Sequence, residues 1–244
     1  MGLAREGYPQ MAGCTAVLGG AMWVVSLWWW PAALPLLAVW GWSIAFFRDP
    51  KREAVFADGE LCSPADGTVQ DICEFAEYPS FDGPVVRVGI FLSLFNVHIN
   101  RAPCAGTVRS VAYCPGKFFA AMKAEAIDQN ESNALVIDPR GALPGPVGVK
   151  QIVGMAARRI VCHAREGTQL DRGERFGLIK FGSRTELVVP KVNGTEILVK
   201  IGDKVRAGLT PLVRLPLTPA GKSDNGSHSE DVERQSAKAS EATA

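Results

Sequence analysis

The chain is organised around the stretch Arg175-Phe-Gly-Leu-Ile-Lys-Phe-Gly-Ser-Arg-Thr-Glu-Leu-Val-Val-Pro190. Two apolar runs, 176–181 and 187–189, flank the step Gly182-Ser183-Arg184, and this pattern predicts two strands joined by a tight turn. Glycine adopts backbone angles that other residues avoid, and it leaves its own carbonyl open to the next hydroxyl. Such a step can hold a strained and reactive geometry. An isolated Gly-Ser pair would indicate only a hairpin turn, so the surrounding sequence must distinguish the two interpretations.

The composition fits a folded protein of one or two domains, since 47% of the 244 residues are hydrophobic. The 26 basic and 25 acidic residues nearly balance, which gives no support to nucleic-acid binding. The cysteines form no C-x-x-C pair, so neither a zinc site nor another metal site is expected. Because no secretory signal with a cleavage site is present, we interpret them as reduced, mostly buried thiols of a protein that faces the cytosol. The six are Cys14, Cys62, Cys73, Cys104, Cys114 and Cys162.

Residues 1–52 are predicted to anchor the chain to a membrane. The segment 14–47 carries no charge and contains all six tryptophans, a residue that favours the membrane interface. One spanning helix needs about 20 apolar residues, so this run is too long for one span and short for two. Prolines divide it near the middle, and basic residues flank both sides, as expected for a hairpin with both ends on the cytoplasmic face of the cell membrane. Spanning and re-entrant forms both fit; a buried helix pair or a cleaved signal peptide fits less well.

Residues 53–217 are predicted to form a mostly β soluble domain, because short apolar runs alternate with Gly, Pro, Asn and Asp. The clearest strand runs are 85–92, 106–111, 134–137 and 159–162. The segment 117–126 fits a short helix or an irregular loop. The remaining residues, 218–244, lack aromatic residues and periodicity and are predicted to be a disordered tail, so His228 has no predicted role.

Two separated segments, 63–69 and 199–213, resemble the halves of a swapped-hairpin β-barrel of the lipoyl and biotinyl kind. The run Ile201-Gly-Asp-Lys-Val-Arg-Ala-Gly208 is a turn signal between strands, and residues 161–173 repeat its pattern. No lysine stands at the tip of a Met-Lys-Met hairpin, so a carried biotin or lipoate is not expected. The predicted fold class is mainly β with few helices: a barrel-sandwich-like soluble domain preceded by an N-terminal apolar membrane helix or hairpin.

Three side chains have the chemistry of a proton-shuttling triad: Ser183, His98 and Asp66. In such a triad the base takes the proton of the hydroxyl nucleophile and the carboxylate orients the base. Each residue also has a simpler interpretation, because Asp-Gly is a turn signal and a histidine in an apolar run is more often a satisfied core residue. His163 is interpreted as a core or surface residue. Composition and spacing do not show that the three side chains meet.

The ordered motifs resemble the phosphatidylserine decarboxylase proenzymes in their short (type A) form. They are FFRDPKR, SPADGTV, FLSLFNVHINRAPCAG, NESN, ARRIVC and RGERFGLIKFGSR, and they follow the apolar N-terminus in that order. The resemblance implies that the chain breaks between Gly182 and Ser183 and that Ser183 becomes an N-terminal pyruvoyl group. It matches Asp66 to the aspartate of the family's Pro-Ala-Asp-Gly motif and His98 to the first histidine of its His-x-x-His pattern. Here the sequence departs from the long-form enzymes, because Arg101 replaces the second histidine.

The resemblance also implies the reaction, the cofactor and the partners. Phosphatidylserine in the bilayer would lose CO2 and become phosphatidylethanolamine, a step of phospholipid biosynthesis. Its amine would form a Schiff base with the pyruvoyl carbonyl derived from Ser183, which acts as an electron sink as pyridoxal phosphate does. His98 and Asp66 would complete the catalytic set, and no metal would be needed. The cleaved chains 1–182 and 183–244 would stay together as a heterodimer, and a homo-oligomer is also compatible.

Three alternatives stay open. A membrane-anchored serine hydrolase would use the same Ser183, His98 and Asp66 on an unbroken chain, although the motif G-x-S-x-G is absent. A non-enzymatic membrane adaptor with a lipoyl-like barrel would not require the Gly182-Ser183 step. Finally, the same chemistry would also suit a differently linked phosphoserine lipid.

Overall fold

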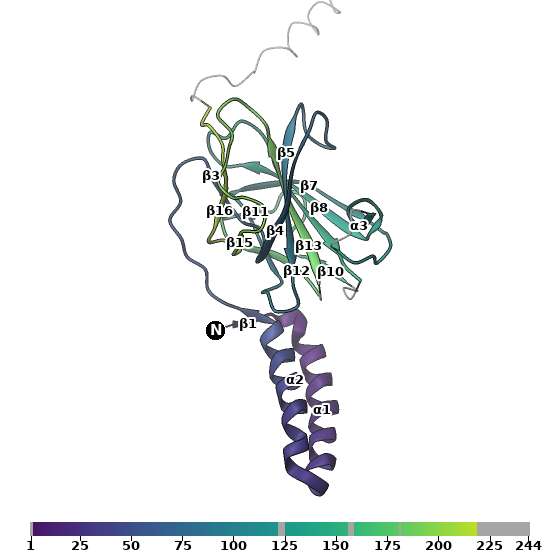
Figure 1. Cartoon of the computed structure of the whole chain (residues 1–244). Helices are drawn as coiled ribbons and strands as arrows, with labels where there is room; N and C mark the ends of the chain where they lie inside the picture. The colour runs from purple at the N-terminus through teal and green to yellow at the C-terminus, as the bar shows by residue number, and fades with distance from the viewer. Residues whose placement is uncertain (1, 122–124, 156–158, 181, 219–244) are drawn as a thin grey trace, which may run out of the picture.

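The computed structural model describes residues 2–121, 125–155, 159–180 and 182–218. An apolar helical hairpin projects from one end of a β domain (Figure 1). The predicted disordered tail lies outside the described residues, apart from Thr218. The predicted fold class, mainly β with an N-terminal apolar hairpin, is confirmed.

The helical hairpin consists of η1 (Arg5–Gly7), α1 (Tyr8–Trp29), the short 3-10 turn η2 (Trp30–Ala32) and α2 (Ala33–Phe46). The two helices lie side by side, and the Trp40 indole donates a hydrogen bond of 3.0 Å to Thr15 Oγ1 between them (Figure 1). The stretch 5–46 is long and apolar enough to cross a membrane, and its most apolar window is 0% buried. The alternative of a buried helix pair in a soluble core is therefore wrong.

Both ends of the helical hairpin are tied together at the β domain. The short strand β1 (Gly2–Leu3) pairs antiparallel with β2 (Arg48–Asp49). An apolar cluster continues this junction from the ends of the helices into the domain. Its buried members are Ala4, Met11, Phe46, Phe47, Val97, Ile99 and Leu178. The hairpin is thus packed against the domain rather than joined to it by a free linker.

The β domain contains one curled eight-stranded antiparallel sheet and two three-stranded sheets. The large sheet has the order β11 (Gln169–Leu170), β7 (Gly106–Cys114), β8 (Ser132–Pro139), β9 (Val147–Val153), β13 (Ser183–Pro190), β5 (Val85–Leu92), β4 (Gly67–Phe75) and β15 (Lys204–Val205). One small sheet has the order β10 (Ile160–Cys162), β12 (Arg175–Ile179) and β6 (Ile99–Arg101). The other has the order β14 (Glu196–Ile197), β16 (Pro211–Arg214) and β3 (Glu60–Cys62), and α3 (Glu125–Gln129) lies before β8.

The predicted strand runs are confirmed as β5, β7, β8 and β10, but the tight turn at Gly182-Ser183-Arg184 is wrong. Ser183 and Arg184 already belong to β13, and β12 and β13 do not pair, because they lie in different sheets. Gly182 has a φ of +59°, and this left-handed step turns the chain out of one sheet and into the next. In the segment 117–126, described helix begins only at Glu125, and 122–124 lie outside the described residues.

The two barrel halves predicted from sequence do pair. β15 pairs with the start of β4, and β16 pairs with β3. The repeated turn behaves in the same way, since β11 pairs with the start of β7. Each copy requires its glycine: a Cβ on Gly67 would lie 2.2 Å from Phe91 O, and one on Gly106 would lie 2.2 Å from Asp138 O. The domain therefore contains two structurally similar corners.

All six cysteines are free, as predicted. Only Cys62 and Cys104 are buried, so the expectation of mostly buried thiols is wrong. Cys14 is exposed on α1, and Cys114 is exposed at the end of β7. Cys14 and Cys114 are more exposed than expected because each lies on a face of its element that does not face the core.

A buried ion cluster crosses the large sheet on the face opposite Ser183. Arg184 is 1% exposed and donates to the carboxylate of Asp71 at 2.6 and 2.8 Å. It also donates to Glu186, which is 0% exposed, at 2.8 Å. Burial alone would raise the pKa of Asp71, but hydrogen bonds from Arg184 and the charge of Arg87 bring it below its ordinary value. The carboxylate therefore stays ionised and compensates a buried guanidinium.

Asp71→Asn should lower the free energy of unfolding by about 3 kcal/mol, because it leaves the buried Arg184 undercompensated. Urea unfolding of the detergent-solubilised chain, followed by circular dichroism, measures the change. The exposed pair Lys191–Glu74 supplies the control, and Glu74→Gln should change stability by less than about 1 kcal/mol. Equal losses in the two variants would contradict the assignment.

Candidate active site

The step Gly182-Ser183 lies at the edge of the large sheet where its central strand β13 begins. Ser183 begins β13 and pairs with Leu92 of β5 on one side and Val153 of β9 on the other. Its side chain is 0% exposed, and its Oγ has no hydrogen-bond partner among the described residues. A buried hydroxyl without a partner is rare, since its desolvation is not compensated. Ser183 is therefore a buried nucleophile directly after a left-handed glycine.

Gly154, which continues from β9, lies against the carbonyl of Gly182. A Cβ on Gly154 would stand 2.2 Å from Gly182 O and 3.1 Å from the Cβ of Ala121. Only glycine allows this approach. The neighbouring Val153 carbonyl is held by Asn130 Nδ2 at 2.8 Å, and Asn130 is 2% exposed. Neither Gly154 nor Asn130 was singled out from sequence, although Asn130 belongs to the NESN motif.

His98 contacts the same segment with both its backbone and its ring. Its carbonyl accepts from Ile179 N at 3.2 Å, and its Nε2 lies 3.3 Å from the N–H of Gly182. The Nδ1 atom lies 3.0 Å from the carbonyl of Asn96. Because Nε2 accepts, Nδ1 must carry the proton and donate to Asn96, which defines the neutral tautomer. The ring also stacks on Phe46, the last residue of α2, with centroids 4.3 Å apart.

Burial lowers the pKa of His98, the hydrogen bond to Asn96 opposes this, and the charge of Arg48 adds a smaller lowering, so that the pKa falls to about 4. The imidazole is therefore neutral near neutral pH and can accept a proton. No hydrogen bond joins it to Ser183 Oγ in the described structure. Catalytic hydrogen bonds are often long or poorly aligned in the resting state and tighten only when the reaction begins.

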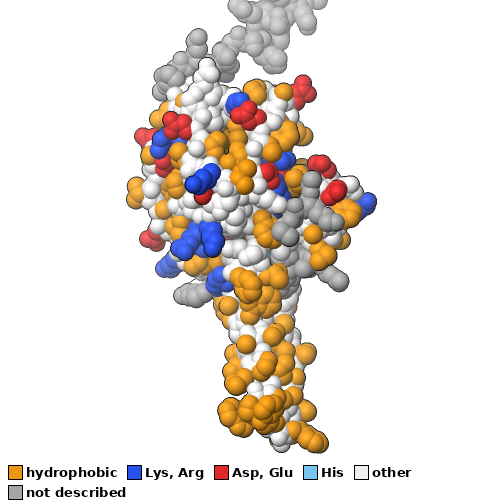
Figure 2. Space-filling view, viewed as in Figure 1, with side chains coloured by type: hydrophobic (Ala, Val, Ile, Leu, Met, Phe, Trp, Pro, Cys, Tyr) orange, Lys and Arg blue, Asp and Glu red, His pale blue; other side chains and the backbone are white. Residues whose placement is uncertain are grey.

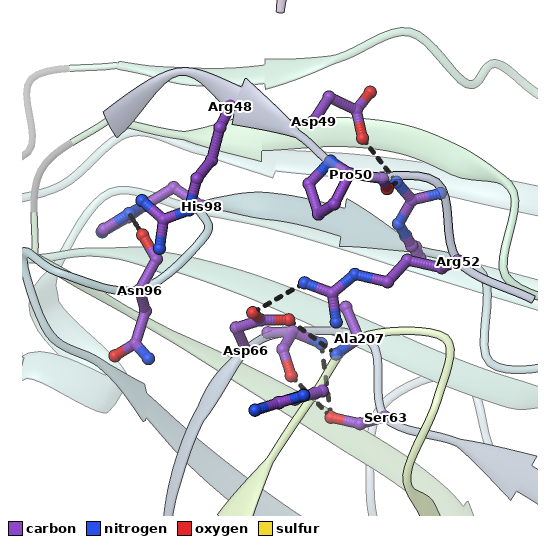
Figure 3. Close-up of polar contacts among 12 residues, drawn as sticks. Arg48, Asp49, Pro50, Arg52, Ser63, Asp66, Asn96, His98 and Ala207 are labelled. Atoms are coloured by element: carbon purple, nitrogen blue, oxygen red, sulfur yellow. Dashed lines mark hydrogen bonds and ion pairs between the residues drawn. The ribbon is translucent and has the colours of Figure 1, made fainter. Parts of the chain in front are cut away.

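Asp66 does not contact His98. Its Oδ1 accepts from the backbone N–H of Ala207 at 2.8 Å, and its Oδ2 pairs with Arg52 Nη2 at 2.9 Å (Figure 3). The place expected for this carboxylate, behind the imidazole, is taken by the carbonyl of Asn96 (Figure 3). The structure thus brings His98 and Ser183 together through Gly182 and places Asp66 against a guanidinium instead.

Comparison of the two similar corners, at Gly67 and Gly106, indicates that Asp66 is more than a turn residue. Asp66 precedes Gly67, whereas Ala105 precedes the equivalent Gly106. The second corner forms the same close backbone approach without an acidic residue before its glycine. Turn geometry alone therefore does not require an acidic residue here.

Arg101, which stands where the long-form enzymes have a second histidine, bonds to residues other than His98. It donates to the carbonyls of Gly173 at 2.9 Å and Pro50 at 3.1 Å, and it pairs with Asp49. Burial lowers its pKa from the ordinary arginine value, against the opposing charge of Asp49. Arg101 thus fastens the segment after the helical hairpin to the barrel.

Of the two other histidines, His163 lies in the described part of the chain. His163 has a side chain that is 53% exposed and pairs with Glu6, so it is a surface residue. His228 lies outside the described residues. Among the residues that are described, no group of three His, Cys, Asp or Glu side chains could hold a metal ion.

Comparison with known proteins places the chain in a family. The sequence profile of the phosphatidylserine decarboxylases matches residues 41–212. The phosphatidylserine decarboxylase proenzyme of Magnetococcus marinus is 45% identical over 222 residues, which cover 87% of this chain and 95% of that protein. The proenzymes of Rhodopirellula baltica (44% identity; 78% of this chain and 79% of that protein) and Cereibacter sphaeroides (43%; 85% and 89%) are also similar. The chain therefore belongs to the phosphatidylserine decarboxylase family.

Proposed function

We propose that this protein is a self-cleaving proenzyme that breaks between Gly182 and Ser183 and then decarboxylates phosphatidylserine. The observation that carries the proposal is Ser183 itself, a fully buried hydroxyl without a partner that follows a left-handed glycine. The neutral imidazole of His98 accepts a hydrogen bond from the N–H of the same glycine, Gly182. A serine hydrolase would need a hydroxyl that its substrate can reach, and the burial of Ser183 disfavours that alternative.

The cleavage uses the residues of the chain alone. His98 Nε2 takes the proton of Ser183 Oγ, which attacks the carbonyl carbon of Gly182 and converts the peptide into an ester. β-Elimination then releases residues 1–182 with a free carboxylate and leaves dehydroalanine at position 183. One water hydrolyses its imine tautomer, ammonia departs and a pyruvoyl group remains. In this proposal Asp66 acts by holding Arg52 and the Ala207 backbone, and it does not orient His98 directly.

A pyruvoyl group fits position 183. Because Ser183 Oγ has no partner, its removal leaves no donor or acceptor unsatisfied. The group supplies an electrophilic carbonyl that acts as an electron sink for the loss of CO2. Departure of the Gly182 end removes the N–H that faces His98 Nε2, so that atom becomes available to move a proton to the carbon that loses CO2.

Sheet pairing favours a heterodimer of the two cleaved chains. The second chain would begin with β13, which lies between β5 and β9 of the first chain. Its later strands β15 and β16 pair with β4 and β3 of the first. Cleavage therefore breaks one covalent bond and leaves these ladders in place.

The helical hairpin suits a lipid substrate. Both of its ends meet at the β domain, so the domain and both ends belong on the same membrane face, and the basic run 48–52 favours the cytoplasmic one (Figure 1). Extracting a lipid is costly, at about 0.8 kcal/mol for each buried CH2. A domain held at the surface has only to bind the headgroup.

Intact-mass spectrometry tests self-cleavage. The wild type should give two chains, 1–182 and 183–244, and the second should be lighter by one ammonia than a peptide that starts with serine. Ser183→Ala should remain one chain. A folded, membrane-bound wild type that stays unbroken would overturn the proposal.

Gly154→Ala should slow self-cleavage at least about tenfold, because its Cβ would displace the Gly182 carbonyl from its position. A time course of cleavage after cell-free synthesis into liposomes measures the rate. Gly41→Ala is the matched control, since a Cβ at Gly41 meets nothing within 4 Å. Equal rates in a folded Gly154→Ala variant and in the control would argue against a constrained carbonyl.

The pH dependence of self-cleavage tests His98 as the base. Its lowered pKa keeps the imidazole neutral, so the rate should stay constant from about pH 8 to about pH 5 and fall with a midpoint near pH 4. The free energy of unfolding should change in the same direction. The contribution of neutral His98 to it is complete above the ordinary histidine pKa of 6.5 and is lost as the pH falls towards the folded-state pKa of about 4. A rate that falls with a midpoint near 6.5 would show that another, exposed group is the base.

A further inference from the structure

A cavity of about 400 Å³ opens at the base of the helical hairpin, beside the candidate active site. Its charged lining consists of Arg48, Lys51, Arg52, Arg206 and Asp66, and this set is called the basic pocket below. Four cations thus face one carboxylate. No ion pair joins Lys51 or Arg206 to a described carboxylate, and Asp66 already pairs with Arg52. The pocket therefore carries excess positive charge.

Arg52 adds a directed donor to this charge. Its side chain is 7% exposed, and its Nη2 is paired with Asp66. Its Nη1 is buried and has no hydrogen-bond partner among the described residues. A buried guanidinium N–H without an acceptor is costly, so an anionic oxygen bound here would be stabilised by a charge-assisted hydrogen bond.

The basic pocket lies between the membrane anchor and His98. Val97 lines it and directly precedes His98 in the chain. Arg48 also lines it, donates to the Ala45 carbonyl of α2 at 2.8 Å, and lies beside the imidazole of His98 (Figure 3). Basic side chains gather on the part of the β domain next to the apolar hairpin (Figure 2). An anion in this pocket would sit at headgroup level, close to the reacting residues.

We propose that the basic pocket binds the phosphodiester of the lipid headgroup and so presents the headgroup to position 183. This inference rests on the proposed function and names the part of the substrate that these residues recognise. Arginine and lysine are the side chains that best match phosphate oxygens in charge and geometry. The apolar part of the pocket lining is limited to Pro50, Val97 and Leu209, so the acyl chains would remain beside the helical hairpin in the bilayer. Free inorganic phosphate shares the same chemistry, so the experiment must separate the two.

Binding can be measured without turnover on the full-length Ser183→Ala chain in a neutral detergent. The probes are dihexanoyl phosphatidylglycerol, a phosphodiester without the serine group, and inorganic phosphate, each titrated calorimetrically. The pocket variant is Lys51→Gln with Arg206→Gln. The control is Arg140→Gln with Lys191→Gln, which removes the same charge from exposed positions outside the pocket lining.

The pocket variant should bind the lipid probe at least about tenfold more weakly than the control, and the loss should shrink as salt is added. Equal affinities in the two double variants would overturn the proposal, because they would indicate attraction to net charge alone. Tighter binding of inorganic phosphate than of the lipid probe would also overturn it, since the site would then serve a free anion.

Turnover provides a second readout on the cleaved wild-type background, normalised to the cleaved fraction by mass. In neutral mixed micelles the pocket variant should raise KM for phosphatidylserine about tenfold, and by more than it lowers kcat. A loss confined to kcat would count against headgroup binding. Absence of cleavage and turnover in the wild type would overturn the proposed function instead, while the binding titration would still decide the role of the pocket.

Discussion

The peptide between Gly182 and Ser183 is clamped by two sheets, and this constraint organises the site. β12 is held by β6 and β10, and β13 is held by β5 and β9. The chain passes from one sheet to the other at a left-handed glycine. Because neighbouring strands fix both sides, neither end of this peptide can shift without breaking the pairing of its strand. The imidazole of His98 then accepts from the Gly182 N–H, and Gly154, which has no side chain, leaves room for the Gly182 carbonyl.

The same clamp explains how breaking a bond could switch on a site without unfolding it. Ser183 is 0% exposed in the unbroken chain, so no substrate amine could reach it. After cleavage, the Gly182 end would be held from one side only, whereas β13 would keep both of its neighbours. Access to position 183 would therefore follow from the freedom of one new chain end.

Local patterns predicted much of this structure, and the failures have a common cause. Alternating apolar runs found β5 and β7, and glycine-rich turns found the two barrel corners. The predicted hairpin at Gly182 was wrong because the apolar pattern of a strand does not specify the neighbouring strand with which it pairs. The spaced motifs predicted Ser183 and His98 as site residues. The sequence did not predict the Asn96 carbonyl, which lies where Asp66 was expected, because it is a main-chain group that any residue could supply. Gly154 was also missed, because its effect comes from the absence of a side chain rather than from a reactive group.

The two similar corners show why the site lies where it does. Each corner packs a glycine against a neighbouring carbonyl, yet only the first carries a carboxylate, at Asp66 rather than Ala105. That carboxylate contacts Arg52, which follows the helical hairpin in sequence, and Arg101 fastens the same segment through Asp49. The near-symmetry is thus broken where the helical hairpin meets the barrel. Phe46, at the end of that hairpin, packs against the ring of His98. Because His98 and the basic pocket both contact the base of the helical hairpin, the depth at which a bilayer holds that hairpin would also set the height of the site above the lipid.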